Sequence, residues 1–203
     1  MLNEAVIMHP NPDVDLCVIQ MGYILGRIKE GFTLKNAFMS ADWRLSEAST
    51  QFVRPIEPII MVGYPNGIWD AHNNRPIARR GLSASHCLMK WNDQRYFVID
   101  CACFPGSSGS PVFLYEDGIY RTDSGHLTPG TRLKLLGTLW GGPTYTAEGK
   151  LIAKPIPSLL SSGSEVVPVV SVMMNLGFVI HADALDDFKP LIINLLRNEN
   201  AMG

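Results

Sequence analysis

Short apolar segments separated by glycine and proline turns are the feature that most constrains the fold of this chain. β-branched and other apolar runs recur along the 203 residues, and most end at a cluster of glycine, proline, asparagine or serine. The 18 glycines and 14 prolines suit a chain of many tight turns. Short strands divided by such turns are typical of an all-β sandwich or barrel. The segments expected to form strands are 15–20, 58–63, 96–100, 111–115, 135–140, 166–173 and 177–180.

The end of the chain follows a different pattern. Six apolar residues recur there at helical spacing: Leu185, Phe188, Leu191, Ile192, Leu195 and Leu196. We expect a helix that begins at Asp183 as its N-cap and is kinked or divided at Pro190. Its apolar stripe is expected to pack against the barrel. The stretch 36–57 is expected to hold loops or a short helix.

Composition and charge exclude several classes of protein. Hydrophobic residues make up 46% of the chain and charged residues 18%, so the chain can form a core and is not typical of disorder. Lys and Arg number 17 against 19 Asp and Glu, which argues against a nucleic-acid binder. The pair Arg79-Arg80 is expected to form a solvated face.

The sequence gives no sign of a membrane or export function. No apolar run approaches the ~18–20 residues that span a bilayer. The N-terminus carries Glu4, Pro10 and Pro12 in place of the basic and apolar regions of a signal peptide. A cytoplasmic location without a membrane partner is therefore expected.

Four cysteines, Cys17, Cys87, Cys101 and Cys103, are too few for a disulfide scaffold, so reduced thiols are expected. Cys101 and Cys103 are spaced C-x-C in an apolar segment, which favours buried structural cysteines over a zinc site. No metal is therefore predicted.

The segment DCACFPGSSGSPVF, residues 100–113, carries the most chemical information. Gly106 and Gly109 allow backbone conformations closed to other residues, so that N–H groups can converge beside a serine hydroxyl as an oxyanion hole requires. The alternative is a polar hairpin loop, because glycine, serine and proline dominate all turns. The G-x-S-x-G elbow of α/β-hydrolases does not fit, since Ser110 stands where that motif has its last glycine and a strand follows.

In its order of motifs the chain resembles the trypsin-like serine proteases of the chymotrypsin fold. Residues 106–111 resemble the G-x-S-G-[GS]-P motif, and 100–113 are similar to bacterial HtrA-type peptidases. Residues 13–19, DVDLCVI, resemble the strand whose leading aspartate orients the catalytic histidine. Weaker similarities follow in the proper order, and together the resemblance covers about residues 5 to 190. They are VGYPNG at 62–67, LGTLWGG at 136–142 and NLGFVI at 175–180.

This resemblance implies an all-β, two-barrel fold with an incomplete first barrel and a C-terminal helix. The expected parts are a partial N-terminal barrel lobe at 1–57, a C-terminal barrel lobe with the serine loop at 58–182, and a helix and tail at 183–203. It also implies acyl transfer onto a serine without metal or organic cofactor, acting on a peptide or protein substrate.

The residue roles implied by the resemblance centre on Ser108 as the nucleophile. Asp15 would orient the histidine, with Asp13 as the competing carboxylate. The N–H groups of Gly106 and Ser108, with Ser107 between them, would form the oxyanion hole. The residues expected to bind substrate are Ala102, Leu139, Trp140, Gly141, Gly142 and Phe178. Ala102 and Phe178 favour a small to medium apolar residue before the scissile bond.

The chain departs from the family at the histidine. The family's chain order is histidine, aspartate, serine, yet His9 is the one histidine before Asp15, and it lies beside Pro10 in an expected turn or edge position. The later histidines match no base motif: they are His72, His86, His126 and His181. Two hypotheses follow. The first is a serine endopeptidase whose chain starts late and lacks its histidine strand. The alternative is a catalytically inactive protease-fold module that binds peptides or a partner protein.

Overall fold

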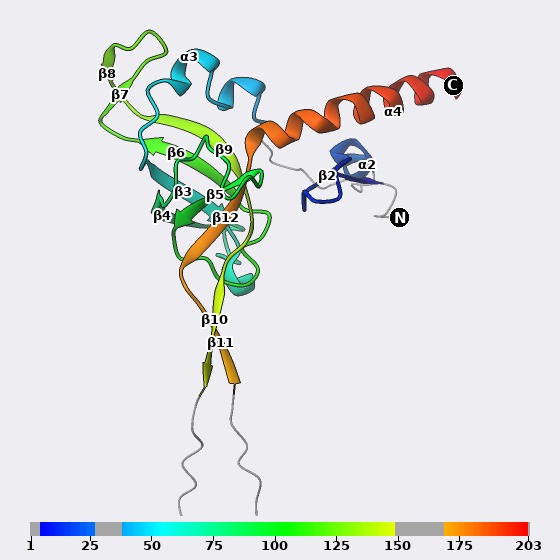
Figure 1. Ribbon diagram of the computed structural model, residues 1–203. Helices are drawn as coiled ribbons and strands as arrows, with labels where there is room; N and C mark the ends of the chain where they lie inside the picture. Colours follow the sequence, from blue (N-terminus) through cyan, green and yellow to red (C-terminus); the bar gives the residue numbers. More distant parts are fainter. Residues whose placement is uncertain (1–4, 27–37, 149–168, 203) are drawn as a thin grey trace, which may run out of the picture.

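The computed structural model describes residues 5–26, 38–148 and 169–202 and consists mainly of β-strands. Its centre is a closed barrel of six antiparallel strands (Figure 1), in the order β12-β5-β4-β3-β6-β9. These are β3 (Pro58–Gly63), β4 (Ile77–Ser83), β5 (Tyr96–Asp100), β6 (Pro111–Glu116), β9 (Arg132–Gly141) and β12 (Leu176–His181). The predicted all-β fold class with a barrel and a C-terminal helix is confirmed.

Alternation of side chains gives the barrel its core. Along β3, Ile59 and Met61 are fully buried while their neighbours are only half-buried, as expected for a strand with one face inward.

Glycine is required where strands approach closely. A Cβ on Gly63 would lie 1.9 Å from the Ser110 hydroxyl oxygen, so the serine loop fits only against a glycine here. The core residues are Ile59, Met61, Cys87, Phe97, Ile99, Cys101, Cys103, Val112, Leu114, Leu136, Leu139 and Val179.

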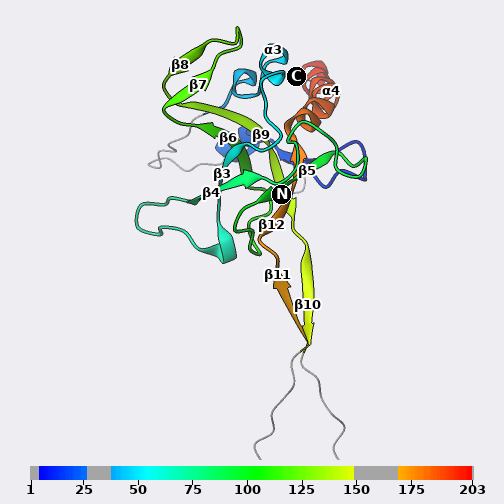
Figure 2. The same ribbon diagram turned by 60° about the vertical axis from the view of Figure 1, so that its left-hand side comes forward.

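Two ribbons extend beyond the barrel (Figures 1 and 2). The first pairs β7 (Ile119–Arg121) with β8 (Leu127–Pro129), and the second pairs β10 (Thr144–Glu148) with β11 (Val169–Met173). Within the predicted strand 166–173, residues 166–168 lie outside the described residues. The second ribbon continues β9 and leads back into β12.

The N-terminal part forms a hairpin of β1 (Val6–Met8) and β2 (Cys17–Ile19), followed by α2 (Met21–Leu25). The 3₁₀ turn η1 (Ala41–Trp43) and α3 (Glu47–Thr50) lie within 36–57, of which residues 36 and 37 are outside the described residues. Loops or a short helix were expected there. The strand expected from residue 15 begins only at Cys17, so Asp15 lies in the turn before it. The three-part domain division remains a prediction.

The C-terminal segment is helical and is divided next to Pro190, as expected, but its cap residue differs from the prediction. A 3₁₀ helix, η3 (Ala182–Phe188), precedes α4 (Lys189–Met202), and Pro190 is the second residue of α4, where a missing N–H costs nothing. The Asp183 cap was wrong: His181 is the cap residue of η3, and Asp183 accepts a hydrogen bond from Arg95 instead.

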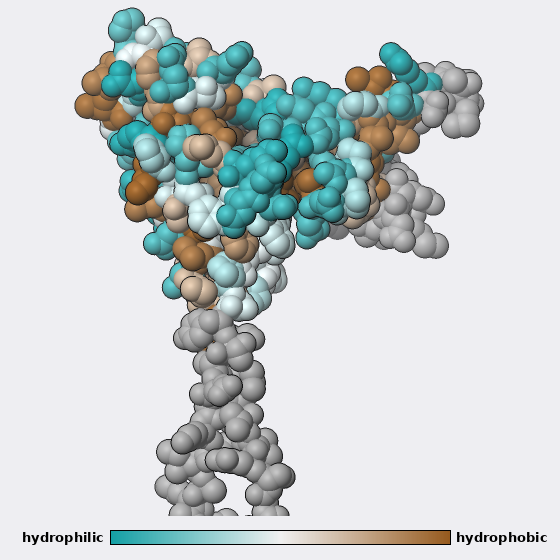
Figure 3. All heavy atoms as spheres, viewed as in Figure 1, coloured by the Kyte–Doolittle hydropathy of each residue, from teal (hydrophilic) through white to brown (hydrophobic). Residues whose placement is uncertain are grey.

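The expected packing of the helical stripe against the barrel was wrong for the part that lies on α4. Of the stripe, Phe188 in η3 is buried, but Ile192 is 38% exposed and Leu196 54% exposed. α4 projects away from the barrel beside the N-terminal hairpin (Figure 1), and hydrophobic residues appear along this arm in Figure 3. An apolar groove of about 540 Å³ lies between α4 and the hairpin. The buried side chains of this segment that the structure describes belong to η3, and Phe188 is the largest of them. No helix in the described ranges is long and apolar enough to cross a membrane.

Candidate active site

The serine loop links β5 to β6 and bends at two glycines. Gly106 and Gly109 have φ values of 80° and 85°, the left-handed region that favours glycine. The loop is held from outside by the Asn66 N–H, which donates to the Pro105 carbonyl at 2.7 Å. At its tip Ser108 is exposed, whereas Ser107 and Ser110 are buried. Only Ser108 of the three therefore presents its side chain to solvent.

In the stretch 106–110 around Ser108, two N–H groups are free. Those of Ser107, Gly109 and Ser110 donate to carbonyls of the protein. Among the described residues, neither the Gly106 nor the Ser108 N–H has a protein acceptor. This is the pair that the sequence assigned to the oxyanion hole. Ser107 contributes no free N–H, because its own is bonded to the Phe104 carbonyl at 3.0 Å.

Ser108 and Asp15 lie in one pocket of about 450 Å³, although 93 residues separate them in the chain. The Ser108 hydroxyl donates to the Trp140 carbonyl at 3.0 Å. No histidine of the described residues lines this pocket. The lining residues come from the hairpin, the serine loop, β9 and η3: Met8, Asp15, Leu16, Cys17, Ser108, Gly109, Thr138, Leu139, Trp140 and Leu185.

His9 lies directly after β1, at the expected turn or edge position, and is buried. Its Nε2 lies 3.2 Å from Asp187 Oδ2, and the Asn11 N–H donates to its Nδ1 at 3.1 Å. Its ring packs edge-on against Phe188, with centroids 5.2 Å apart. The sequence missed this because the partners are some 180 residues away. Nδ1 is bonded to Asn11, whereas Nε2 is buried near Asp187 without a hydrogen bond that any described residue completes. Through Asp187 and Phe188, His9 fastens the hairpin to η3.

The remaining histidines do not line the pocket of Ser108 either. His72 and His126 are exposed, and His86 is half-buried. His181 lines a different pocket of about 470 Å³, together with Arg44 and Asp186. Burial lowers the pKa of His181, which favours its neutral form.

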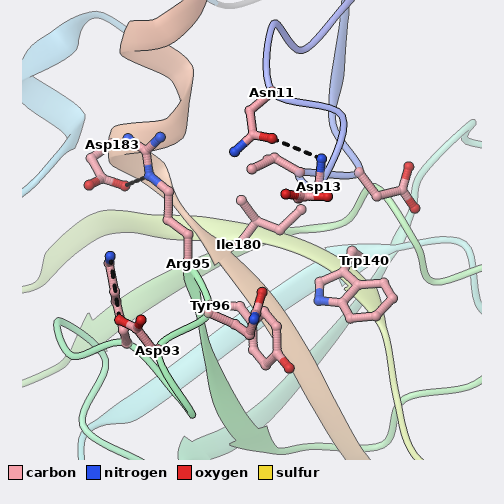
Figure 4. Close-up of a pocket in the computed structure, with 12 residues that line it drawn as sticks. Asn11, Asp13, Asp93, Arg95, Tyr96, Trp140, Ile180 and Asp183 are labelled. Atoms are coloured by element: carbon pink, nitrogen blue, oxygen red, sulfur yellow. Dashed lines mark hydrogen bonds and ion pairs between the residues drawn. The ribbon is translucent and has the colours of Figure 1, made fainter.

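A larger, polar pocket of about 640 Å³ adjoins the pocket of Ser108 (Figure 4). The two pockets share Asp15 and Trp140. The hairpin turn lies on one side and the barrel on the other, with Arg95 bound to Asp183 at 3.3 Å. Asp13 and Asp15, by contrast, form no ion pair with another described residue. The two pockets together form a cleft between hairpin and barrel.

The residues expected to bind substrate occupy one end of the barrel. Trp140 stacks on Phe178, with centroids 5.7 Å apart and planes at 22°, and Gly141 pairs with Phe178 across β9 and β12. Leu139 is buried, and its N–H and carbonyl bond to the serine loop, so it offers no group to a peptide. Gly142 lies against the carbonyl of Leu176, which leaves no room for a Cβ.

The prediction that Arg79-Arg80 forms a solvated face was wrong for Arg79. Arg80 is exposed, over the ring of Tyr115, but Arg79 is half-buried and donates to the Ala102 carbonyl and to Ser107 Oγ. Adjacent residues of a strand point to opposite faces, so the alternation in IARRGLS was the available signal.

The buried thiols are unsuited to nucleophilic chemistry. Cys101 and Cys103 are buried as expected, although they follow β5 and do not belong to it. Burial raises the pKa of Cys87 and of Cys103 to about 12. Cys17 is exposed and lines the pocket of Ser108. Among the described residues, no group of His, Cys, Asp or Glu could hold a metal ion.

Comparison with known proteins identifies the family. The family model for the trypsin-like peptidase domain matches residues 2–119, more than half of the chain. The chain therefore belongs to the trypsin-like peptidase domain family, and the matched part contains both Asp15 and Ser108. No curated protein and no solved structure matches it.

Proposed function

We propose that this domain is a serine-type endopeptidase that forms an acyl-enzyme on Ser108. The observation that carries the proposal is the exposed Ser108 in one pocket with Asp15, where the N–H groups of Gly106 and of Ser108 itself have no acceptor among the described residues. These donors would bind the negative oxygen of the tetrahedral intermediate. Membership of the trypsin-like peptidase family supports a protease-type function.

The reaction needs a base that this pocket does not contain. The Ser108 hydroxyl would attack the scissile carbonyl while an imidazole takes its proton and passes it to the leaving amine; water then hydrolyses the acyl-enzyme. Since no described histidine lines the pocket, we propose that the histidine comes from outside this chain. Asp15, exposed at the pocket wall, would orient that imidazole.

The substrate is proposed to lie along the end of β9. β9 pairs with β6 only as far as Thr138, so its edge beyond Leu139 is open on that side. An extended peptide could add there by main-chain hydrogen bonds. The half-buried Ala102 and the aromatic Phe178 favour an apolar residue before the scissile bond.

An organophosphonate probe, read by mass spectrometry, tests the nucleophile. Labelling at Ser108 is expected to be slow and to accelerate with added imidazole, which supplies a base of pKa near neutrality. Ser108→Ala should abolish labelling, while Ser124→Ala, at an exposed turn, should not change it. Labelling of Ser108→Ala at the wild-type rate would contradict the proposal.

A second candidate function is peptide binding without catalysis. It is favoured by the Ser108 hydroxyl, which donates to the Trp140 carbonyl and not to a base. Extended peptides that bind without cleavage, with no Ser108 adduct at any imidazole concentration, would establish this function in place of the first.

A further inference from the structure

Arg79 is placed behind the serine loop by the alternation of β4. Its neighbour Arg80 points outward, with its guanidinium 5.6 Å from the centroid of Tyr115. Arg79 points the other way, into the space where β5 has left the side of β4. The two strands pair only at Leu82 and Ser83. Beyond that point β4 has β3 on one side, and on the other it meets the serine loop through Arg79.

The guanidinium of Arg79 connects two points of the loop. One nitrogen, Nη1, donates to the Ala102 carbonyl at the start of the loop. The other, Nη2, donates to Ser107 Oγ at 3.0 Å, directly before Ser108. Ser107 is only 1% exposed, so this contact is shielded from water. Because the guanidinium is planar and rigid, its two donors fix the separation of their acceptors.

The charge of Arg79 has no carboxylate partner among the described residues. Its Nε is buried and has no hydrogen-bond acceptor. A half-buried cation with only neutral partners costs stability, and an apolar side chain would avoid this cost. The arrangement therefore calls for an explanation other than stability.

We propose that Arg79 is a positioning residue that holds the serine loop with the Gly106 and Ser108 N–H groups free, so that the oxyanion hole exists before substrate binds. The inference rests on the proposed function. Backbone hydrogen bonds hold the loop at Pro105 and Gly109. Arg79 adds a side-chain restraint on each side of Gly106, whose positive φ makes this part of the loop conformationally free. Donors fixed in advance need no reorganisation when charge develops, and the unpaired cation behind them favours the same charge.

A peptide boronate tests this role. Its boron takes up Ser108 Oγ, the hydroxyl proton leaves to solvent, and the resulting tetrahedral anion imitates the intermediate. The boronate peptide ends in the boronate analogue of valine. The matched control ligand has the same sequence but ends in valine amide, which imitates the ground state. Arg79→Met should weaken boronate binding by about 10- to 100-fold, the loss expected for hydrogen bonds from a charged donor. Binding of the amide should change less than about threefold. Arg79→Lys keeps the charge but loses the two parallel donors of the planar guanidinium, so its boronate affinity should be intermediate.

Arg80→Met on the same strand is the control and should leave both affinities unchanged. The proposal is overturned if Arg79→Met binds the boronate as Arg80→Met does. Equal losses for boronate and amide would also overturn it, since they would indicate a general structural role. If Arg79→Met does not fold, Ser107→Ala, which removes one acceptor, should still weaken the boronate selectively.

Hydrogen exchange separates failure of this inference from failure of the proposed function. A wild-type chain that forms no boronate adduct would refute the proposed function. The Ser107 and Gly109 amides, hydrogen-bonded in the loop, then report its order directly. In Arg79→Met they should exchange at least tenfold faster than in Arg80→Met, while amides of β3 and β6 stay protected. Unchanged loop exchange would refute the role of Arg79.

Discussion

Single residues in this molecule differ in chemistry according to burial more than according to type. Ser107, Ser108 and Ser110 share one loop, yet only Ser108 is exposed. Arg79 and Arg80 are adjacent, yet one holds the loop and the other contacts solvent. The cysteines show the same division, with Cys17 exposed and the other three buried.

The buried thiols make stability dependent on alkaline pH. Burial raises the pKa of Cys87 and Cys103 from 9.0 to about 12 in the folded state. Above pH 9 the unfolded thiols therefore lose protons that the folded ones keep, which favours unfolding. The free energy of unfolding should fall between pH 9 and 12, by up to about 1.4 kcal/mol per pH unit for each thiol.

Urea unfolding at pH 8 and pH 10 measures this fall. In the Cys87→Ala, Cys103→Ala double variant the fall should be smaller, whereas Cys17→Ala should behave as wild type. A double variant with the full wild-type pH dependence would refute the assignment to these thiols.

Elements outside the barrel are fastened to it at a few points. The N-terminal hairpin meets η3 through His9, which contacts Asp187 and Phe188. Arg95 on the barrel also binds Asp187, so one carboxylate joins hairpin and barrel. Beyond Phe188, α4 leaves the body and its apolar residues stay partly exposed.

His9→Leu should loosen the hairpin. It removes the contact to Asp187 and the bond to Asn11 while leaving an apolar side chain against Phe188, and we expect a loss of about 1–3 kcal/mol in unfolding free energy. Amide exchange of residues 6–19 should accelerate before that of the barrel. His126→Leu, at an exposed turn, is the control. Equal exchange in both variants would show that His9 fastens nothing.

Polar substitution on α4 should be tolerated. Ile193→Glu and Leu196→Glu replace side chains that are about half-exposed, so each should change the unfolding free energy by less than about 0.5 kcal/mol. Phe188→Ala, by comparison, should cost about 3–5 kcal/mol, since that side chain is buried. Chemical denaturation compares the three. A large loss in Leu196→Glu but not in Ile193→Glu, which lies outside the predicted stripe, would mean that the stripe packs in solution, as its spacing first indicated.

At the scale of the whole molecule, one complete barrel faces a two-stranded hairpin across the cleft. The hairpin supplies Asp15 and the barrel supplies Ser108, but no described histidine enters their pocket. Both edges of the β1–β2 sheet also lack a further strand among the described residues. Such edges favour association with other chains.

Peptide hydrolysis by the 203-residue chain should therefore be very slow. Other triad systems that lack a member retain roughly 10³–10⁴-fold catalysis over water, so weak turnover dependent on Ser108 is expected. Fusion of a strand that carries a histidine to the N-terminus should raise turnover and solubility together, because it supplies a base and covers an open strand edge. Rapid proteolysis by the 203-residue chain alone would show that one of its own histidines is the base.

Local pattern in the sequence determined most of the barrel and the bend of the serine loop. Short apolar segments ended by turns predicted β3, β5, β6, β9 and β12, because such runs are visible in the strand's own residues. β4 was not predicted, since its residues Ile77–Ser83 include two arginines and a glycine and form no apolar run. The spacing of Gly106, Ser108 and Gly109 likewise predicted a bend with an exposed serine, since positive φ is a local property of glycine.

Contacts between distant residues were decided only by the tertiary structure. The burial of His9 depends on Asp187 and Phe188, and the role of Arg79 depends on a loop that begins more than 20 residues later. The direction of α4 depends on which surfaces of the barrel and hairpin can pack against it. The helical period identifies an apolar face but does not specify its partner. Spacing within a segment therefore determined the local geometry of this protein, while the partner of each side chain was decided by packing.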